Sequence, residues 1–396
     1  MTAQPQSASR PALLALSPRA RIIATFALHA LSQGGLFSRI PDIQQNLGLN
    51  EAALGLALLG QPVGAIATFL FASAVLEKIG TRRILMLAIP LLSATVMLIG
   101  LAPNALVLGL AFACYGVLFG LSNIAMNVEA DRVEAQSGNR VMNTCHGVWS
   151  LGLLTATLIG TLARGAAISP ALHFALMVPL ILAGTALVVW PMSPAPPRAH
   201  TGTAARGRIA LPTLMTLILV GFAIAGALLE GALRNWSVIF MRDSFSAPAW
   251  VDTLTLPSFL IAQTAGRLQA DRLITRFGPV AVARTLLAVA LIGLGLVVFS
   301  PNLIVALIGF AMVGVGICVS FPLTTSAAAR LGDRPASENV AALTLVTQIT
   351  ILGAPALLGY VATTYGIRLT FAILLPFVLI ALYLARYLAP KPAIPG

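Results

Sequence analysis

One acidic residue, Glu230, follows 21 residues that carry no charge (209–229). A carboxylate in a membrane-spanning helix costs about 2.5 to 3.5 kcal/mol near the bilayer centre, so it requires a partner or a use. Arg234 follows one helical turn later, on the same face. We expect the pair toward the outer end of its helix. It is either a protonatable carboxylate whose pKa an arginine tunes, or a structural ion pair.

A comparable place in the first apolar stretch carries Gln33, with His29 one turn before it. The shared helical face predicts that both side chains line a cavity opposite Glu230. The alternative for His29 is a buried histidine bonded to a backbone carbonyl.

Arg39 and Asp42 end this first stretch. We expect them at the outer mouth, paired with Glu230 or Asp252 in a gate. A solvated cluster at the membrane surface is the alternative.

Two further stripes of polar residues occur near one loop. Asn123 and Asn127 are spaced i, i+4, and Asn143, His146 and Ser150 are spaced i, i+3, i+7. They predict either a hydrated pathway for a sugar or polyol, favoured for Asn127 and His146, or bonding between helices, favoured for the others. His146 is also a candidate proton carrier.

Trp236 and Gln348 complete the candidate residues. Trp236 is either an aromatic anchor at the membrane surface, which we favour, or a platform for a sugar ring. Gln348 is an amide in an otherwise apolar stretch that contains threonines.

The elements that position these residues follow from composition. The chain of 396 residues is 58% hydrophobic and 9% charged, which excludes an ordinary soluble enzyme. Ten stretches without Asp, Glu, Lys or Arg are candidate spans, and two of them, 84–128 and 285–329, contain a Pro-Asn turn near the middle. Splitting both predicts an all-α integral membrane protein with twelve transmembrane helices.

The distribution of basic residues predicts the orientation. With the amino terminus inside, 19 of the 24 Lys and Arg residues fall in inner segments, so both termini are expected in the cytoplasm. The net charge of +12 is then a consequence of topology rather than a surface for nucleic acid.

The chain also repeats internally. The turns Pro103-Asn104 and Pro301-Asn302 lie 198 residues apart, half of the chain. We therefore expect an amino-terminal six-helix bundle (1–190), a cytoplasmic linker (191–208) rich in Pro, Ala, Thr and Arg, and a carboxy-terminal six-helix bundle (209–396). Equivalent inner loops carry charged residues that we expect to latch the bundles together: Glu77, Arg82, Asp271 and Arg272.

These loops resemble the acid-base-glycine signature of the major facilitator superfamily of secondary transporters. The first departs from it with Glu77 for the usual Asp and Ser73 for a common Gly, and the second, from Gly266-Arg267-Leu268 to Phe277-Gly278, is closer. The segments 38–42 and 230–232, with Trp236, resemble the fucose-permease-like branch. The resemblance implies two bundles related by a pseudo-twofold axis, a central cavity and alternating access.

No nucleotide-binding loop, zinc motif or hydrolase elbow occurs, so no cofactor, metal or enzymatic activity is expected. A channel would favour rings of repeated polar residues, which are not evident here. We predict a monomeric carrier in the inner (plasma) membrane that takes up a small polar, sugar-like solute with protons. The alternative is proton-antiport efflux of amphipathic drugs or metabolites.

Overall fold

The computed structural model describes residues 16–138, 140–195 and 211–389, without the side chains of Phe69, Asn143 and Ser337. Every regular element in these ranges is a helix. The first half contains α1 (Pro18–Leu31), η2 (Leu36–Arg39), α2 (Ile40–Asn46), α3 (Glu51–Leu58), α4 (Gly60–Ile79), α5 (Thr81–Gly100), α6 (Ala105–Ser137), α7 (Met142–Gly165) and α8 (Pro170–Val188). The second half contains α9 (Leu214–Ser244), α10 (Ala249–Asp252), α11 (Thr255–Phe277), α12 (Pro279–Val298), α13 (Leu303–Ile317), α14 (Ser320–Ala329), α15 (Ala336–Ile351), α16 (Ala354–Tyr365), α17 (Ile367–Ala372), α18 (Leu375–Leu384) and η3 (Ala385–Leu388).

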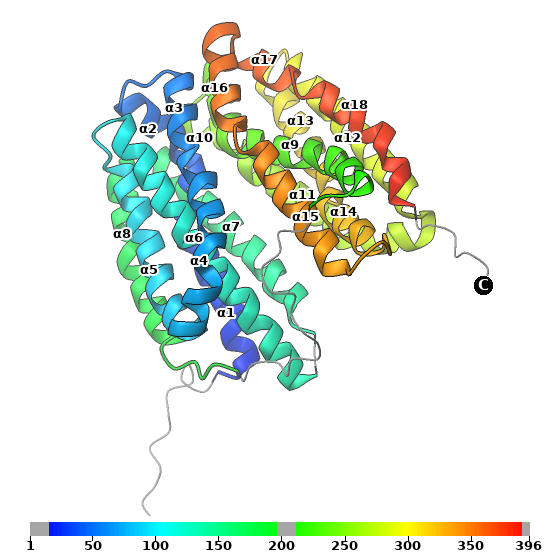
Figure 1. The fold of residues 1–396 in the computed structure, drawn as a ribbon. Helices are drawn as coiled ribbons and strands as arrows, with labels where there is room; N and C mark the ends of the chain where they lie inside the picture. Colours follow the sequence, from blue (N-terminus) through cyan, green and yellow to red (C-terminus); the bar gives the residue numbers. More distant parts are fainter. Residues whose placement is uncertain (1–15, 139, 196–210, 390–396) are drawn as a thin grey trace, which may run out of the picture.

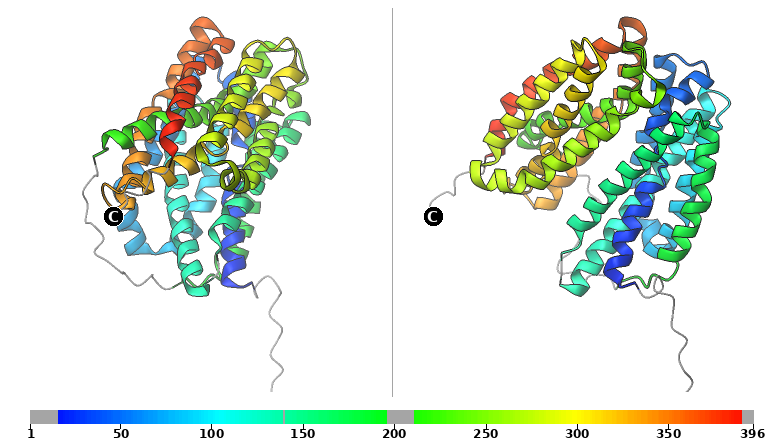
Figure 2. Two further views of the ribbon diagram at one scale, coloured as in Figure 1. Left: turned by 90° about the vertical axis from the view of Figure 1, so that its right-hand side faces the viewer. Right: turned by 180° about the vertical axis from the view of Figure 1, so that it is seen from behind.

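The helices form two groups. Figure 1 shows α1–α8 in one group and α9–α18 in the other, and the groups approach each other where α2, α3, α10 and α16 lie. Between the groups, α3 packs against α16, α7 against α10 and α11, and α2 against α9. The views in Figure 2 show the groups diverging toward the opposite end of the molecule. We call the end where the groups approach each other the closed end, and the end where they diverge the open end.

Ten helical segments of the described chain are long and apolar enough to cross a membrane. The sequence predicts two further spans, which correspond to α1 and α11. Neither helix is among the ten segments. α1 is only 14 residues long, and α11 carries four charged residues in its second half, Arg267, Asp271, Arg272 and Arg276. Large apolar side chains are exposed on the outside, for example Leu70 (87%) and Phe299 (79%), as expected of a surface that faces lipid.

The internal repeat has a structural counterpart in helix ends. Asn104 and Asn302 are the N-caps of α6 and α13, and each side chain accepts a hydrogen bond from the backbone N–H three residues later. Gly80 and Gly278, also 198 residues apart, end α4 and α11 with φ of 84° and 80°. Only glycine adopts such values without strain, so the loops after α4 and α11 turn in the same way.

A break after α1 explains its shortness. Gly34 and Gly35 have φ of 56° and 65°, and a Cβ on Gly35 would lie 2.4 Å from the carbonyl oxygen of Ala156. Glycine at this place therefore allows close contact with α7. The chain then continues through η2 and α2.

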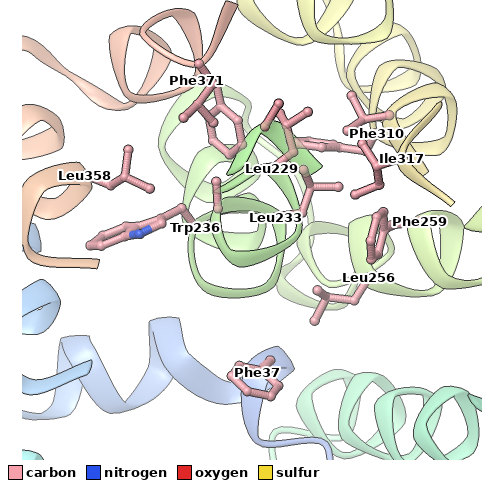
Figure 3. Close-up of a cluster of buried hydrophobic side chains, with 14 of the residues drawn as sticks. Phe37, Leu229, Leu233, Trp236, Leu256, Phe259, Phe310, Ile317, Leu358 and Phe371 are labelled. Atoms are coloured by element: carbon pink, nitrogen blue, oxygen red, sulfur yellow. The ribbon is translucent and has the colours of Figure 1, made fainter. Parts of the chain in front are cut away.

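The core of the second group surrounds α9. Trp236, Leu229 and Leu233 of this helix belong to one buried cluster with Phe371, Phe310 and Leu358 of their own group and with Phe37 of the first group (Figure 3). α9 therefore packs within its own group and also contacts η2, which carries Phe37.

Candidate functional site

A cavity of about 370 Å³ lies between the two groups. Leu58, Gln61, Pro62, Ala65 and Phe119 line it from the first group, and α9, α11 and α13–α16 line it from the second. Its polar or amphipathic lining residues are Gln61, Glu230, Arg234, Asn235, Trp236, Arg267, Ser320, Thr344, Thr347 and Gln348.

Glu230 and Arg234 form an ion pair on the wall of this cavity. Arg234 Nη2 lies 3.0 Å from Glu230 Oε1, and the two side chains are 25% and 37% exposed. The guanidinium also lies over the ring of Phe37, 5.2 Å from its centroid. Because α9 continues to Ser244, Glu230 lies near the middle of its helix. The expected position toward the outer end is therefore wrong.

Trp236 is fully buried, which contradicts the favoured interpretation of an anchor at the membrane surface. Its ring reaches α16, where a Cβ added to Gly359 would lie 3.0 Å from it. The indole Nε1 has no hydrogen-bond partner within the described residues. Trp236 nevertheless lines the cavity, as does Gln348.

The prediction for Gln33 and His29 differs from the observed arrangement, because neither lines the cavity. Gln33 Oε1 accepts a hydrogen bond from the hydroxyl of Tyr115 at 3.0 Å, and His29 Nδ1 accepts one from Trp149 Nε1 at 3.1 Å. Both side chains are buried. His29 on α1 and Gln33 in the turn after α1 are thus bonded within the first group rather than facing Glu230, and the partner of His29 is a side chain, not a backbone carbonyl.

Of the two polar stripes, Asn123, Asn127, His146 and Ser150 do not line the cavity either. Asn127 Nδ2 donates to the backbone oxygen of Asn123 at 2.8 Å, within one helix. The rings of His146 and Phe26 pack edge to face, with their centroids 5.4 Å apart. The side chain of Asn143 lies outside the part of the chain that the structure describes.

Sequence reasoning missed three residues of the cavity as candidates for substrate contact: Gln61, Asn235 and Arg267. Gln61 is an amide in an uncharged stretch, the same signal that identified Gln348. Asn235 is adjacent to two candidates. Arg267 was considered only as part of a loop motif, not as a residue that contacts substrate. Its position on α11 places it on the cavity wall.

At the closed end, the predicted gate residues form a cluster that connects the groups. Arg39 Nε lies 2.7 Å from Asp42, and Arg164 Nε lies 2.8 Å from the other oxygen of Asp42. Arg164 also lies 3.6 Å from Asp252 of the second group and donates to the carbonyl oxygen of Ala249. Asp42 and Asp252 are thus joined through Arg164, which the sequence did not single out, and Glu230 takes no part.

A second connection at this end joins α9 to the first group. Arg242 Nη1 donates to Gln44 Oε1 at 3.0 Å and lies 3.9 Å from Glu51. The backbone N–H of Ala52 donates to Thr363 Oγ1 of α16 at 2.8 Å. These contacts hold the two groups together at the closed end.

Burial affects the carboxyl of Asp252, which is only 3% exposed. Removal from water raises the pKa of Asp252 to about 6, although Arg164 and Arg242 oppose the shift. Its Oδ1 has no hydrogen-bond partner among the described residues.

The predicted inner latch residues lie toward the open end. Within the described residues, no ion pair joins Glu77, Asp271 or Arg272 across the groups. Arg82 Nε instead donates to the carbonyl oxygen of Trp190 at 3.0 Å, within the first group.

A cavity lined from both of two groups of membrane-length helices is the arrangement expected of a membrane transport protein. The sequence profile of the Major Facilitator Superfamily matches residues 22–334, and the chain belongs to this family. The uncharacterized transporter y4wD of Sinorhizobium fredii is 29% identical over 378 residues, which cover 94% of this chain and 98% of the relative.

Solved structures share the fold. The nucleoside transporter NupG is similar with a TM-score of 0.70 at 14% identity, over 94% of this chain and 98% of NupG. The D-xylose-proton symporter is similar with a TM-score of 0.71 at 12% identity, over 93% of this chain and 96% of the symporter. The chain is thus a multi-pass membrane transporter with an all-helical major facilitator fold.

Proposed function

We propose that this protein moves a small polar, sugar-like solute by alternating access, coupled to protons. The observation that carries this proposal is the cavity itself. It is lined from both groups, and three amides, Gln61, Asn235 and Gln348, can bond hydroxyl groups there. The D-xylose-proton symporter has the same fold, which is compatible with such a substrate.

The proposed architecture has twelve spans in two bundles, 1–190 and 209–396, with α1 and α11 as the two further spans. Residues 196–208 of the proposed linker lie outside the described residues. We place the protein in the inner (plasma) membrane as a monomer, with both termini cytoplasmic, because basic residues are concentrated in the segments expected inside.

With that orientation the structure is an inward-open state. Arg39, Arg164 and Arg242 fall in the outer segments, and their contacts close the outer end. Glu77 and Asp271 lie at the other end without a partner across the groups among the described residues. Their proposed role as latches belongs to the outward-open state, where the inner ends would meet.

For proton coupling we propose Glu230 with Arg234, and His146 as a second candidate. Glu230 is in contact with the cavity, so a proton and a substrate can reach the same space. Arg234 gives the carboxylate a charged partner 3.0 Å away on the same wall of the cavity.

The fucose-permease-like assignment is part of this proposal and rests on segments 38–42 and 230–232. Efflux of amphipathic drugs is the second candidate, and the apolar part of the lining favours it, with Phe321, Ile317 and Ile351. We favour a small solute because about 370 Å³ is near the lower limit of ligand pockets.

Purified protein in proteoliposomes distinguishes the two candidates. A pH gradient is imposed so that the vesicle interior is either more acidic or more alkaline than the medium. The vesicles are then offered labelled hexose derivatives or rhodamine 6G. We expect hexose accumulation into vesicles whose interior is more alkaline than the medium, abolished by a protonophore. Gradient-driven movement of rhodamine 6G with no hexose movement would instead establish the efflux function.

A further inference from the structure

The ion pair between Glu230 and Arg234 uses only part of each side chain. A single contact joins them, from Arg234 Nη2 to Glu230 Oε1 at 3.0 Å. Among the residues that the structure describes, no hydrogen bond or ion pair engages Glu230 Oε2, Arg234 Nη1 or Arg234 Nε. None of these three atoms is buried. Because both residues line the cavity, the free atoms of the pair are accessible to a solute on the cavity wall.

The wall beside this pair has room for a ligand. Gly231 follows Glu230 on α9 and lines the cavity, and no neighbouring heavy atom lies within 4 Å of the place where its Cβ would stand. Ala227 also lines the cavity and lies one turn before Gly231 on the same face. Two residues with a small or absent side chain thus leave a hollow next to the charged atoms.

The free atoms of the pair make opposite demands on a ligand. An ionised carboxylate only accepts hydrogen bonds and a guanidinium only donates them, whereas a hydroxyl group does both. Two hydroxyls on adjacent carbons can therefore bind side by side, one donating to Glu230 Oε2 and the other accepting from Arg234 Nη1. The two charges already neutralise each other at 3.0 Å. A charged solute is attracted by one member and repelled by the other, so a neutral solute fits the pair best.

We propose that Glu230 and Arg234 together recognise a vicinal diol, which is a pair of hydroxyl groups on adjacent carbons, in a neutral sugar or cyclic polyol. The carbon skeleton of the solute lies over Gly231 and Ala227. Both hydrogen bonds involve an ionised group, and such bonds are about twice as strong as bonds between neutral groups. This inference rests on the proposed transport function and names the part of the solute that the cavity selects.

Two isomeric probes of equal size and equal hydroxyl count isolate this feature. All-cis-1,2,3-cyclohexanetriol carries adjacent hydroxyls, whereas cis-1,3,5-cyclohexanetriol has none on neighbouring carbons. Thermal unfolding of the purified full-length protein is followed at increasing concentrations of each. We expect the 1,2,3 isomer to stabilise the protein at about a tenfold lower concentration, because the other isomer cannot bond both charged groups at once. Non-specific effects of a polyol on stability are common to both isomers.

Variants assign the preference to the pair. Arg234→Lys keeps the positive charge beside Glu230 but replaces the planar fork of donors with one ammonium group, and should reduce the preference to about twofold or less. A purely structural ion pair would leave the preference unchanged. Gly231→Leu fills the hollow and should abolish the response to both triols. Gly295→Leu on α12 is the matched control, because nothing lies within 4 Å of a Cβ there and Gly295 is not among the lining residues. It should respond as the wild type does.

Several outcomes would overturn the inference. Equal stabilisation of the wild type by the two triols would refute it, as would a full preference in Arg234→Lys, and hexose accumulation in proteoliposomes would then still support sugar transport. No response to either triol, together with gradient-driven movement of rhodamine 6G and no hexose movement, would refute the proposed function as well. Size-exclusion profiles verify folding, and the comparison of the isomers in the wild type stands if a variant does not fold.

Discussion

Glu230 has its ionic partner on its own helix, four residues away. A pair within one helix persists when two groups of helices move relative to each other. This distinguishes it from the pair of Arg164 and Asp252, which joins the two groups and must separate if the closed end opens.

Replacement Glu230→Gln keeps the size and hydrogen bonding of the side chain but removes its proton. We expect the variant to exchange bound substrate across the membrane while losing accumulation driven by a pH gradient. Uptake and counterflow in proteoliposomes measure the two activities, and Glu338→Gln is the control, since Glu338 is not among the cavity lining. Accumulation equal to wild type would make Glu230 structural, with His146 and Asp42 next to test.

The raised pKa of Asp252 predicts that the population of the closed form depends on pH. Its pKa is raised to about 6 in the closed form, mainly by burial, and would return toward the ordinary 3.8 if the end opened to water. The closed form then binds the proton more tightly. The proton-linked stabilisation of the closed form relative to the open form grows as the pH falls below about 6. It reaches its full size below 3.8 and is absent well above 6. Arg39, Arg164, Arg242, Asp42 and Asp243 supply the surrounding charge.

Spin labels at Gln45→Cys and Ser246→Cys, in a background where the three native cysteines are serine, measure this equilibrium. We expect the closed population to gain about tenfold over the open one between about pH 7.5 and about pH 5. Asp252→Asn should abolish that dependence, whereas Asp243→Asn should preserve it. A pH dependence that survives in Asp252→Asn would contradict the assignment.

At the scale of elements, the contact between α3 and α16 is the tightest approach between the two groups that we identify. A Cβ on Gly55 would lie 2.5 Å from the carbonyl oxygen of Pro355, and one on Gly359 would lie 2.3 Å from that of Glu51. Neither backbone can yield without moving its helix. Two small residues therefore allow the closed end to form.

The substitution Gly55→Ala should destabilise the closed end by about 1 to 3 kcal/mol, because the added methyl group overpacks this contact. The same spin-label pair at positions 45 and 246 should show an additional, longer distance. Gly295→Ala is the matched control, since nothing lies within 4 Å of a Cβ at that position. An unchanged distance distribution in Gly55→Ala would show that the closed end tolerates the methyl group.

At the scale of the whole molecule, the two groups meet at one end and separate at the other (Figures 1 and 2). The cavity lies between them, so each half contributes one wall. Under the proposed alternating access, a solute would reach the cavity from one side at a time, with both halves starting and ending on the same side of the membrane.

That condition can be measured with single cysteines in place of Ser193 and of Gly396, in the cysteine-free background. An impermeant maleimide should label both from the cytoplasmic side and neither from outside, because both segments belong to the positively charged inner set. A cysteine at Gln45 should label from outside and serves as the opposite control. Labelling of Ser193→Cys and Gly396→Cys from opposite sides would refute the topology.

The sequence alone was sufficient for the membrane character, the two helical hairpins and the 198-residue repeat. These features depend on local properties: the absence of charge over a membrane thickness, and turn or cap residues such as Asn104 and Gly278. It also predicted the Glu230 and Arg234 pair, because residues four apart on a helix are always neighbours.

The tertiary structure decided which helical faces meet. Successive residues of a helix point about 100° apart, so a small difference in how a helix is rotated moves a side chain from the cavity into the core. Gln33 and His29 were expected in the cavity and lie inside the first group, while Gln61 and Arg267 lie on its wall. The link from Asp42 through Arg164 to Asp252 joins three distant segments, and only the packing of α7 against α10 brings them together.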